Sequence, residues 1–146
     1  EAALRVFVER AKPVFDDIVL DTAAGMGAPF EAACAVADSV LLVITPDPVA
    51  MRDGHIVCDA LAAKSLENIR LIINRVPPRL TGCGIRDLDE CIDTVGAQLI
   101  GVVPESTEVR TAGAMGTALP KKSTAYQVFS AIAARLCGDS VPLIVR

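Results

Sequence analysis

Residues able to bind a nucleotide or a metal ion follow four short apolar runs of the chain. The runs span residues 18–20, 40–44, 71–73 and 99–103. Asp21 follows the first run, and Gly25 lies in the same loop. An aspartate there can hold a Mg²⁺-bound water beside a triphosphate, and a glycine can donate its backbone N–H to the terminal phosphate. The pattern predicts a catalytic, metal-binding loop, but an aspartate at a strand end also serves simply as a helix cap.

The third and fourth runs end in residues suited to a purine base. Asn74 and Arg75 follow the third run, and Pro104 and Glu105 follow the fourth. An asparagine amide has a donor and an acceptor that match the edge of adenine, and an arginine can stack on a base. Two interpretations stay open, because Asn74 also suits a turn and Arg75 a solvated position.

Helical patterns separate the apolar runs and determine how the strands are connected. We expect helices over residues 1–11, 29–37, 47–65, 87–97, 107–115 and 124–137. Each run is continuously apolar, as strands buried on both faces of a parallel sheet are. With right-handed crossovers, this order predicts an α/β fold: an open, doubly wound parallel sheet of four strands flanked by helices. Ligands of such sheets bind beyond the carboxyl ends of the strands.

Two of the expected helices carry clear end signals. Asp47 followed by Pro48 is typical of an N-cap and a first helical residue. In the last helix, Thr124 with Gln127 predicts a capping box, and Gly138 predicts a C-cap. The apolar spacing of that helix predicts a buried face of Ala125, Val128, Phe129, Ile132, Ala133 and Leu136.

Composition limits the class of protein. Of the 146 residues, 52% are hydrophobic and only 3% aromatic, so one domain with an aliphatic core is expected. The net charge is −4 and no basic run exceeds Lys121-Lys122, which argues against a nucleic-acid surface. The five cysteines include no C-x-x-C pair, which disfavours a zinc site. The single histidine, His55, is expected on the surface of a helix.

Taken in order, these segments resemble the MinD/ParA family of deviant-P-loop ATPases, and its MinD branch most closely. The similar segments are residues 18–25 (switch II), 45–53 (a T-P-E-x-x-x-x-R-D stretch), 71–75 (the strand end that reads adenine), 101–105 with Val109 (the segment over the base) and 138–143 (the tail). The resemblance covers nearly the whole chain from Phe15 on. It implies a partial P-loop NTPase fold, in an ATPase that forms a dimer with ATP between its protomers.

The resemblance also implies roles for individual residues. Asp21 would take the Mg²⁺ and water role, and Gly25 would sense the γ-phosphate. Arg52 and Asp53 would lie on the dimer and partner-binding face. The residues implied around adenine are Asn74, Arg75, Pro104, Glu105 and Val109.

For the complete protein, the resemblance implies ATP and Mg²⁺ as cofactors and a homodimer formed with ATP. It implies division-inhibitor and regulator proteins as partners, and no nucleic acid. The expected location is the cytoplasm, with peripheral attachment to the inner face of the cell membrane through a tail outside this chain. The implied role is a switch for selection of the cell-division site.

One departure from the family pattern determines what the chain alone is expected to do. The family's K-G-G-x-G-K-[ST] phosphate-binding loop does not occur in the sequence. We therefore expect residues 1–146 to be the carboxyl-terminal part of a MinD-like ATPase domain, inactive alone and prone to oligomerise. The alternatives are a nucleotide-independent interaction or dimerisation module, or a ParA-type partition or flagellar-number relative. A phosphate-accepting receiver domain is disfavoured, because it needs an acidic pair at its first strand.

Overall fold

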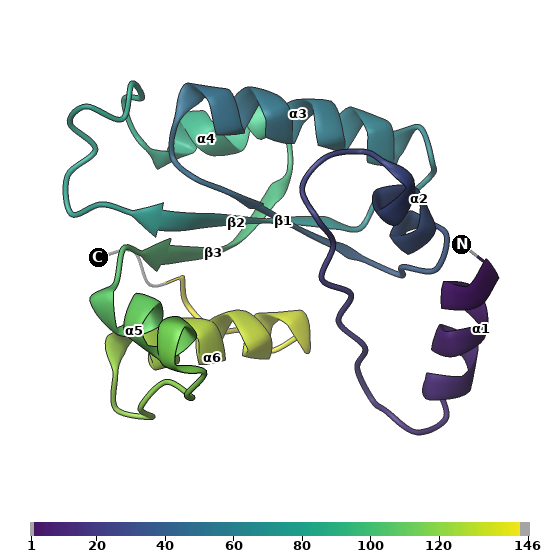
Figure 1. Cartoon of the computed structure of the whole chain (residues 1–146). Helices are drawn as coiled ribbons and strands as arrows, with labels where there is room; N and C mark the ends of the chain where they lie inside the picture. The colour runs from purple at the N-terminus through teal and green to yellow at the C-terminus, as the bar shows by residue number, and fades with distance from the viewer. Residues whose placement is uncertain (1, 144–146) are drawn as a thin grey trace. The chain divides into compact units, whose positions relative to one another are not determined.

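The computed structural model describes residues 2–143, and these form two compact units (Figure 1). The first, here called the amino-terminal unit, contains the chain up to Val40 together with Asp59–Asn68. The second, here called the sheet unit, contains Leu41–Cys58 and the chain from Ile69 onward. Each unit is described by itself.

The sheet unit is built on an open parallel sheet of three strands. These are β1 (Val40–Ile44), β2 (Ile69–Val76) and β3 (Gln98–Pro104), in the order β1-β2-β3. Strands β2 and β3 pair in parallel, with Leu71 opposite Leu99 and Ile73 opposite Val102. Three of the four apolar runs therefore form strands, and the predicted open parallel sheet flanked by helices is confirmed.

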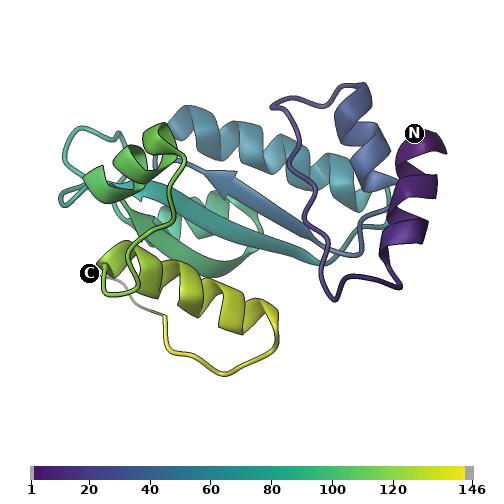
Figure 2. The ribbon, with the colours of Figure 1, turned by 60° about the horizontal axis from the view of Figure 1, so that its bottom comes forward.

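Helices cover both faces of this sheet, as Figures 1 and 2 show. Helices α3 (Pro48–Ala62) and α4 (Leu88–Val95) lie on one face, and α6 (Thr124–Leu136) lies on the other. Leu71 and Ile73 of β2 are fully buried in the core toward α3 and α4, whereas Ile72 packs in the core that includes Ile132 of α6. Burial on both faces explains why β2 and β3 are continuously apolar, whereas β1 alternates, with Leu41 and Val43 39% and 53% exposed.

A glycine lets α6 approach the sheet closely. A Cβ added at Gly101 of β3 would lie 2.4 Å from Cγ1 of Ile132, which is far too close for two carbon atoms that are not bonded to each other. Only a residue without a side chain therefore fits beneath this turn of α6. The contact sets the height of α6 above β3.

Side-chain caps define where the helices of the sheet unit begin. Asp47 accepts hydrogen bonds from the backbone N–H groups of Val49 (3.1 Å) and Ala50 (3.0 Å), which confirms it as the N-cap of α3. Helix α6 is capped by Ser123, which accepts from the Tyr126 N–H at 3.1 Å. The capping box predicted from Thr124 was therefore placed one residue too late.

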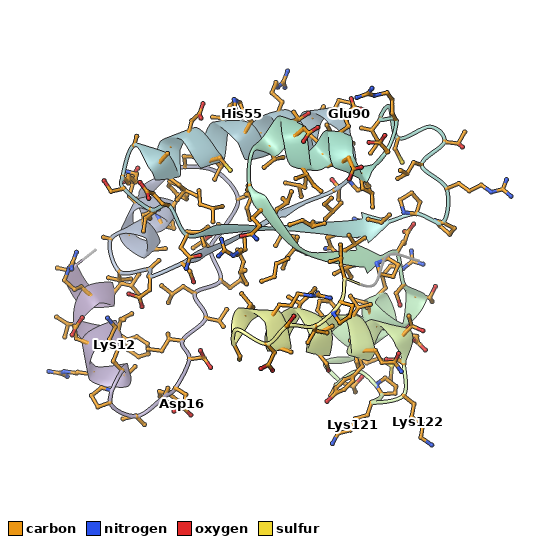
Figure 3. All side chains as sticks on the ribbon, turned by 180° about the vertical axis from the view of Figure 1, so that it is seen from behind. Lys12, Asp16, His55, Glu90, Lys121 and Lys122 are labelled. Atoms are coloured by element: carbon orange, nitrogen blue, oxygen red, sulfur yellow. The ribbon has the colours of Figure 1, made fainter. Side chains whose placement is uncertain are left out.

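The buried face of α6 also differs from the prediction. Phe129 and Leu136 are 39% and 45% exposed, and Ala133 is exposed as well. The buried residues of α6 are Ala125, Val128, Ala131 and Ile132. The loop before α6 carries Lys121 and Lys122, whose side chains point away from the fold in Figure 3.

The amino-terminal unit contains two helices and no strand among its described residues preceding β1. Helix α1 (Ala2–Ala11) is tied to the end of α2 (Ala28–Cys34) by a hydrogen bond of 2.9 Å from Arg5 to the Ala35 carbonyl. Lys64 and Glu31 form an ion pair of 2.6 Å. The strand predicted at residues 18–20 is wrong, because this segment forms no strand and pairs with no described strand, and Val19 is 87% exposed.

Candidate nucleotide-facing site

The carboxyl end of β2 leaves the sheet ladder in an unusual conformation. Ile73 pairs with Val102 and Val76 with Pro104, so one extra residue of β2 lies in this interval. Arg75 has φ 56°, a left-handed conformation that is uncommon for a residue with a side chain. Oδ1 of Asn74 accepts a hydrogen bond of 2.9 Å from the Arg75 N–H, which stabilises this bend.

This bend presents two groups suited to a base. The Asn74 side-chain carbonyl is used in the local bond, so its amide nitrogen is the group that can donate to a ring nitrogen of a ligand. Arg75 is exposed, and a planar guanidinium at an exposed position can stack on an aromatic base. The turn interpretation of Asn74 and its predicted binding role are therefore compatible.

The end of β3 is fixed beside this bend. The Glu105 N–H donates to the Val76 carbonyl at 2.8 Å, which extends the pairing one step beyond Pro104. Helix α5 (Thr107–Met115) follows directly, and the hydroxyl of its N-cap Ser106 accepts from the Val109 N–H at 3.4 Å. Ser106 was not among the predicted site residues, although a serine three residues before Val109 is a recognisable cap.

Five predicted adenine-binding residues thus lie at one edge of the sheet, on the ends of β2 and β3 and the start of α5. They are Asn74, Arg75, Pro104, Glu105 and Val109. The arrangement agrees with the rule that open parallel sheets bind ligands beyond the carboxyl ends of their strands. Adenine binding by these residues stays a prediction.

The two predicted catalytic residues belong to the amino-terminal unit. Asp21 is exposed and lines a shallow depression of about 300 Å³, whose other lining residues include Leu4, Leu20 and Pro29. Gly25 has φ 96°, a conformation open to glycine but strained for other residues. This geometry suits a loop that presents a backbone N–H, and the roles of Asp21 and Gly25 stay predictions.

The described residues fit only part of a Mg²⁺–ATP site. They contain no group of three or more His, Cys, Asp or Glu residues that could hold a metal ion, so Asp21 would act as a single carboxylate. Mg²⁺ is commonly held by one or two carboxylates together with substrate phosphates. Those phosphates need a glycine-rich loop with a lysine, and the sequence contains no such motif. The described residues therefore do not fit the phosphate and metal end of such a site, and the adenine end stays a prediction.

The predicted partner face lies on α3. Arg52 and Asp53 are adjacent, their side chains are 71% and 65% exposed, and Arg52 Nε lies 3.9 Å from an Asp53 carboxylate oxygen. His55 on the same helix is exposed, as expected, and Figure 3 shows it on the helical layer that also carries Glu90 of α4. A pair this exposed contributes little to stability, which leaves both charges available to a partner.

Comparison with known proteins places the chain near one group. No protein-family model matches it. The putative septum site-determining protein MinD of Emiliania huxleyi is 34% identical over 141 residues, which are 94% of this chain and 52% of that protein. The septum site-determining protein MinD of Bacillus subtilis is 32% identical over 97% of this chain and 54% of its own length. The chain thus spans about half the length of these relatives.

Solved structures lead to the same group. The MinD cell division protein of Aquifex aeolicus has a TM-score of 0.90 at 28% identity, covering 99% of this chain and 63% of that one. MinD in the MinC:MinD complex of the same organism has a TM-score of 0.86 at 28% identity, covering 96% and 59%. The MinD of Pyrococcus horikoshii complexed with Mg-ADP shares the fold, with a TM-score of 0.78 at 22% identity over 91% and 55% of the two chains. Along nearly its whole length, the chain is similar to about half of each of these MinD proteins.

Proposed function

We propose that this chain supplies the adenine-binding side of a MinD-like, ATP-dependent switch that acts in selection of the cell-division site. The observation that carries the proposal is the bend at Asn74 and Arg75, fixed beside the end of β3 by the bond between Glu105 and Val76. The names of its relatives, septum site-determining proteins, support the biological role. The Mg-ADP complex of a protein with the same fold supports nucleotide binding.

The phosphate end of the site is proposed to come from a segment other than residues 1–146. That segment would carry the glycine-rich loop, and Asp21 and Gly25 would meet the Mg²⁺ ion and γ-phosphate that it holds. Alone, the chain would not hydrolyse ATP, because phosphate binding depends mainly on backbone amides and a lysine of such a loop. With the loop present, the complete protein would form a homodimer around ATP.

A chimaera tests this proposal. The part of Aquifex aeolicus MinD that this chain does not match is joined upstream of residues 1–146, and ATP hydrolysis is measured. We expect hydrolysis by the chimaera and none by the chain alone. In the chimaera, Asn74→Ala should raise KM for ATP about tenfold through the lost hydrogen bond. Asn68→Ala, at an exposed position outside the site, is the matched control.

The same experiment distinguishes the alternative function. A folded chimaera that forms dimers without ATP and hydrolyses none would favour a nucleotide-independent interaction module. Equal effects of Asn74→Ala and Asn68→Ala on KM would remove the adenine-binding role while leaving the ATPase itself intact.

We propose the exposed pair on α3 as the contact for a division-inhibitor partner. The support is a solved MinC:MinD complex whose MinD is 28% identical to this chain. Reversing both charges, Arg52→Glu with Asp53→Lys, should abolish capture of MinC by the chimaera, since like charges then face each other. Capture unchanged by the double reversal would exclude this face.

We also propose that the complete protein works in the cytoplasm, attached peripherally to the inner face of the cell membrane. In the part of the chain that the structure describes, no helix is long and apolar enough to cross a membrane. Attachment would depend on a tail outside this chain, so residues 1–146 should not sediment with anionic phospholipid vesicles. Sedimentation of this chain with such vesicles would contradict that dependence.

A further inference from the structure

The chain reverses direction at the end of α6. Gly138 has φ 93°, and its N–H donates to the Arg135 carbonyl at 3.1 Å, while the Asp139 N–H donates to Ala134 at 3.0 Å. These two bonds form a Schellman motif, which ends a helix and turns the chain back. Figure 2 shows the following residues, here called the tail (residues 139–143), running back along α6.

One side chain holds this tail. The Arg135 guanidinium donates from Nε to the Val141 carbonyl at 2.9 Å and from Nη2 to the Pro142 carbonyl. Its Nη1 donates to the Ile100 carbonyl of β3 at 2.8 Å. The five N–H donors of an arginine form a rigid fork, so a single residue can join two separate segments in this way.

The carbonyl of Ile100 is available because β3 is irregular at this residue. Leu99 and Gly101 pair with the consecutive β2 residues Leu71 and Ile72, so Ile100 is an extra residue in the ladder. The close contact between Gly101 and Ile132 brings α6 down onto this point. Arg135 lies about one helical turn beyond Ile132, which carries its guanidinium to the bulge.

Within residues 2–143, the tail has little else to hold it in place. Asp139, Ser140, Pro142 and Leu143 are exposed and Val141 is only half-buried. The hydrophobic burial that fixes most segments is therefore small here. The position of the tail depends mainly on hydrogen bonds from one charged group, and such a contact can open without unfolding of the core.

We propose that Arg135 is a clasp and that the tail is a releasable strap held against the bulge of β3. Among the described residues, β3 lies at the end of the sheet order, and a strand in that position is open to pairing with another chain. Arg135 holds the Ile100 carbonyl through one nitrogen and the tail carbonyls through two others, so the tail can be released while the bond to β3 remains. The proposal does not depend on nucleotide binding.

Hydrogen exchange of the whole chain tests the clasp. Arg135→Ala should speed exchange of the Asp139 and Val141 amides, the hydrogen-bonded amides of the tail, by at least about tenfold, because the two bonds that hold the tail are lost. Arg135→Lys keeps the charge without the fork and should give an intermediate rate. Exchange in residues 71–76 of β2 should stay unchanged. Arg86→Ala, which removes an exposed arginine bound to Glu90, is the matched control.

Two results would overturn the clasp. One is unchanged exchange of the tail in Arg135→Ala, and the other is an equal rise in the tail and in β2, which indicates general destabilisation. The unmodified chain provides a second measurement. Thermolysin cleavage at the tail should proceed at a rate independent of low urea concentrations, as local release does, whereas a strong urea dependence would mean that the tail opens only with the fold.

Discussion

Two apolar segments of similar composition have opposite fates in this molecule. Residues 40–44 form β1, and Ile44 is 5% exposed in the core with α3 and α4. Residues 18–20 form no strand, and Val19 is 87% exposed. The difference lies in the partners, because β1 has β2 beside it, whereas the earlier segment pairs with no strand in the described part of the chain.

This comparison shows that an apolar run predicts the capacity to form a strand rather than the strand itself. Backbone N–H and C=O groups of a strand need a neighbour, and apolar side chains need a covering layer. The sheet unit provides both around β2. In the amino-terminal unit Val14, Phe15 and Val19 remain more than half exposed, which is the kind of surface that a further polypeptide segment covers.

The largest expected difference between the two regions is in the free energy of unfolding, after one apolar side chain is truncated in each. Ile73→Ala should lower the free energy of unfolding by about 2–5 kcal/mol, because Ile73 is fully buried. Val19→Ala should change it by less than about 0.5 kcal/mol. Urea denaturation of both variants measures the difference. A large loss for Val19→Ala would mean that residues 18–20 are packed in solution.

Two glycine substitutions within the sheet unit should change its stability in opposite directions. Gly101→Ala should destabilise by about 1–3 kcal/mol, since the new Cβ would overlap Ile132. Gly113→Ala is the matched control, with no atom within 4 Å of the added Cβ, and should stabilise α5 by about 0.5–1 kcal/mol. Thermal melts of the two variants should shift in opposite directions. Equal shifts would contradict the close approach of α6.

The cap of α3 should make a smaller contribution to the free energy of unfolding, and this contribution should depend on pH. The Thr45 hydroxyl and then the Ala50 N–H hold the pKa of Asp47 below its ordinary value. Its stabilisation is therefore complete above the aspartate pKa of an unfolded chain, about 4, and is lost as the pH falls through the lowered value.

Replacement of Asp47 checks this expectation. Asp47→Ala should remove about 1 kcal/mol at pH 7 and flatten the acid limb of the stability profile. Asp16→Ala, at an exposed position of the amino-terminal unit, should leave that limb unchanged. An acid limb equally steep in Asp47→Ala and the unmodified chain would rule out this cap as its source.

Cysteine labelling tests the core of the sheet unit without any substitution, so the expected change in stability is the smallest. Burial, and then the neighbouring Glu90 and Asp87, raise the pKa of the Cys91 thiol to about 11, so little reactive thiolate exists at pH 8. Cys137 is exposed. Iodoacetamide should modify Cys137 rapidly and Cys91 only after unfolding. Early modification of Cys91 under native conditions would show that the core of the sheet unit opens readily.

Much of the sheet unit could be predicted from the sequence because its signals are local. Continuous apolar runs indicated β1, β2 and β3, and Asp47 identified the start of α3. The capping of α6 by Ser123 was missed because Ser123 and Thr124 are both good caps and only the path of the preceding loop decides between them. The exposure of Phe129 was likewise missed, because apolar spacing does not reveal which flank of the apolar face of α6 meets the sheet.

The site was predictable in part. Polar residues after two strands indicated one ligand-binding edge, and the bond between Glu105 and Val76 brings those ends together. The left-handed bend at Arg75 could not be predicted, because it depends on an extra residue in the pairing of β2 with β3. The Arg135 clasp was missed because it joins residues distant in sequence.

Titration of the chain with adenosine and with ATP, followed by NMR, measures whether the ends of β2 and β3 bind the base. We predict millimolar binding of both ligands, with affinities within about threefold of each other because no phosphate-binding loop is present. The shifted amides should be those of Asn74, Arg75 and Glu105. Saturable ATP binding in the micromolar range would show that these residues hold the phosphates without a further loop. Binding that leaves these three amides unmoved would place the base elsewhere on the chain.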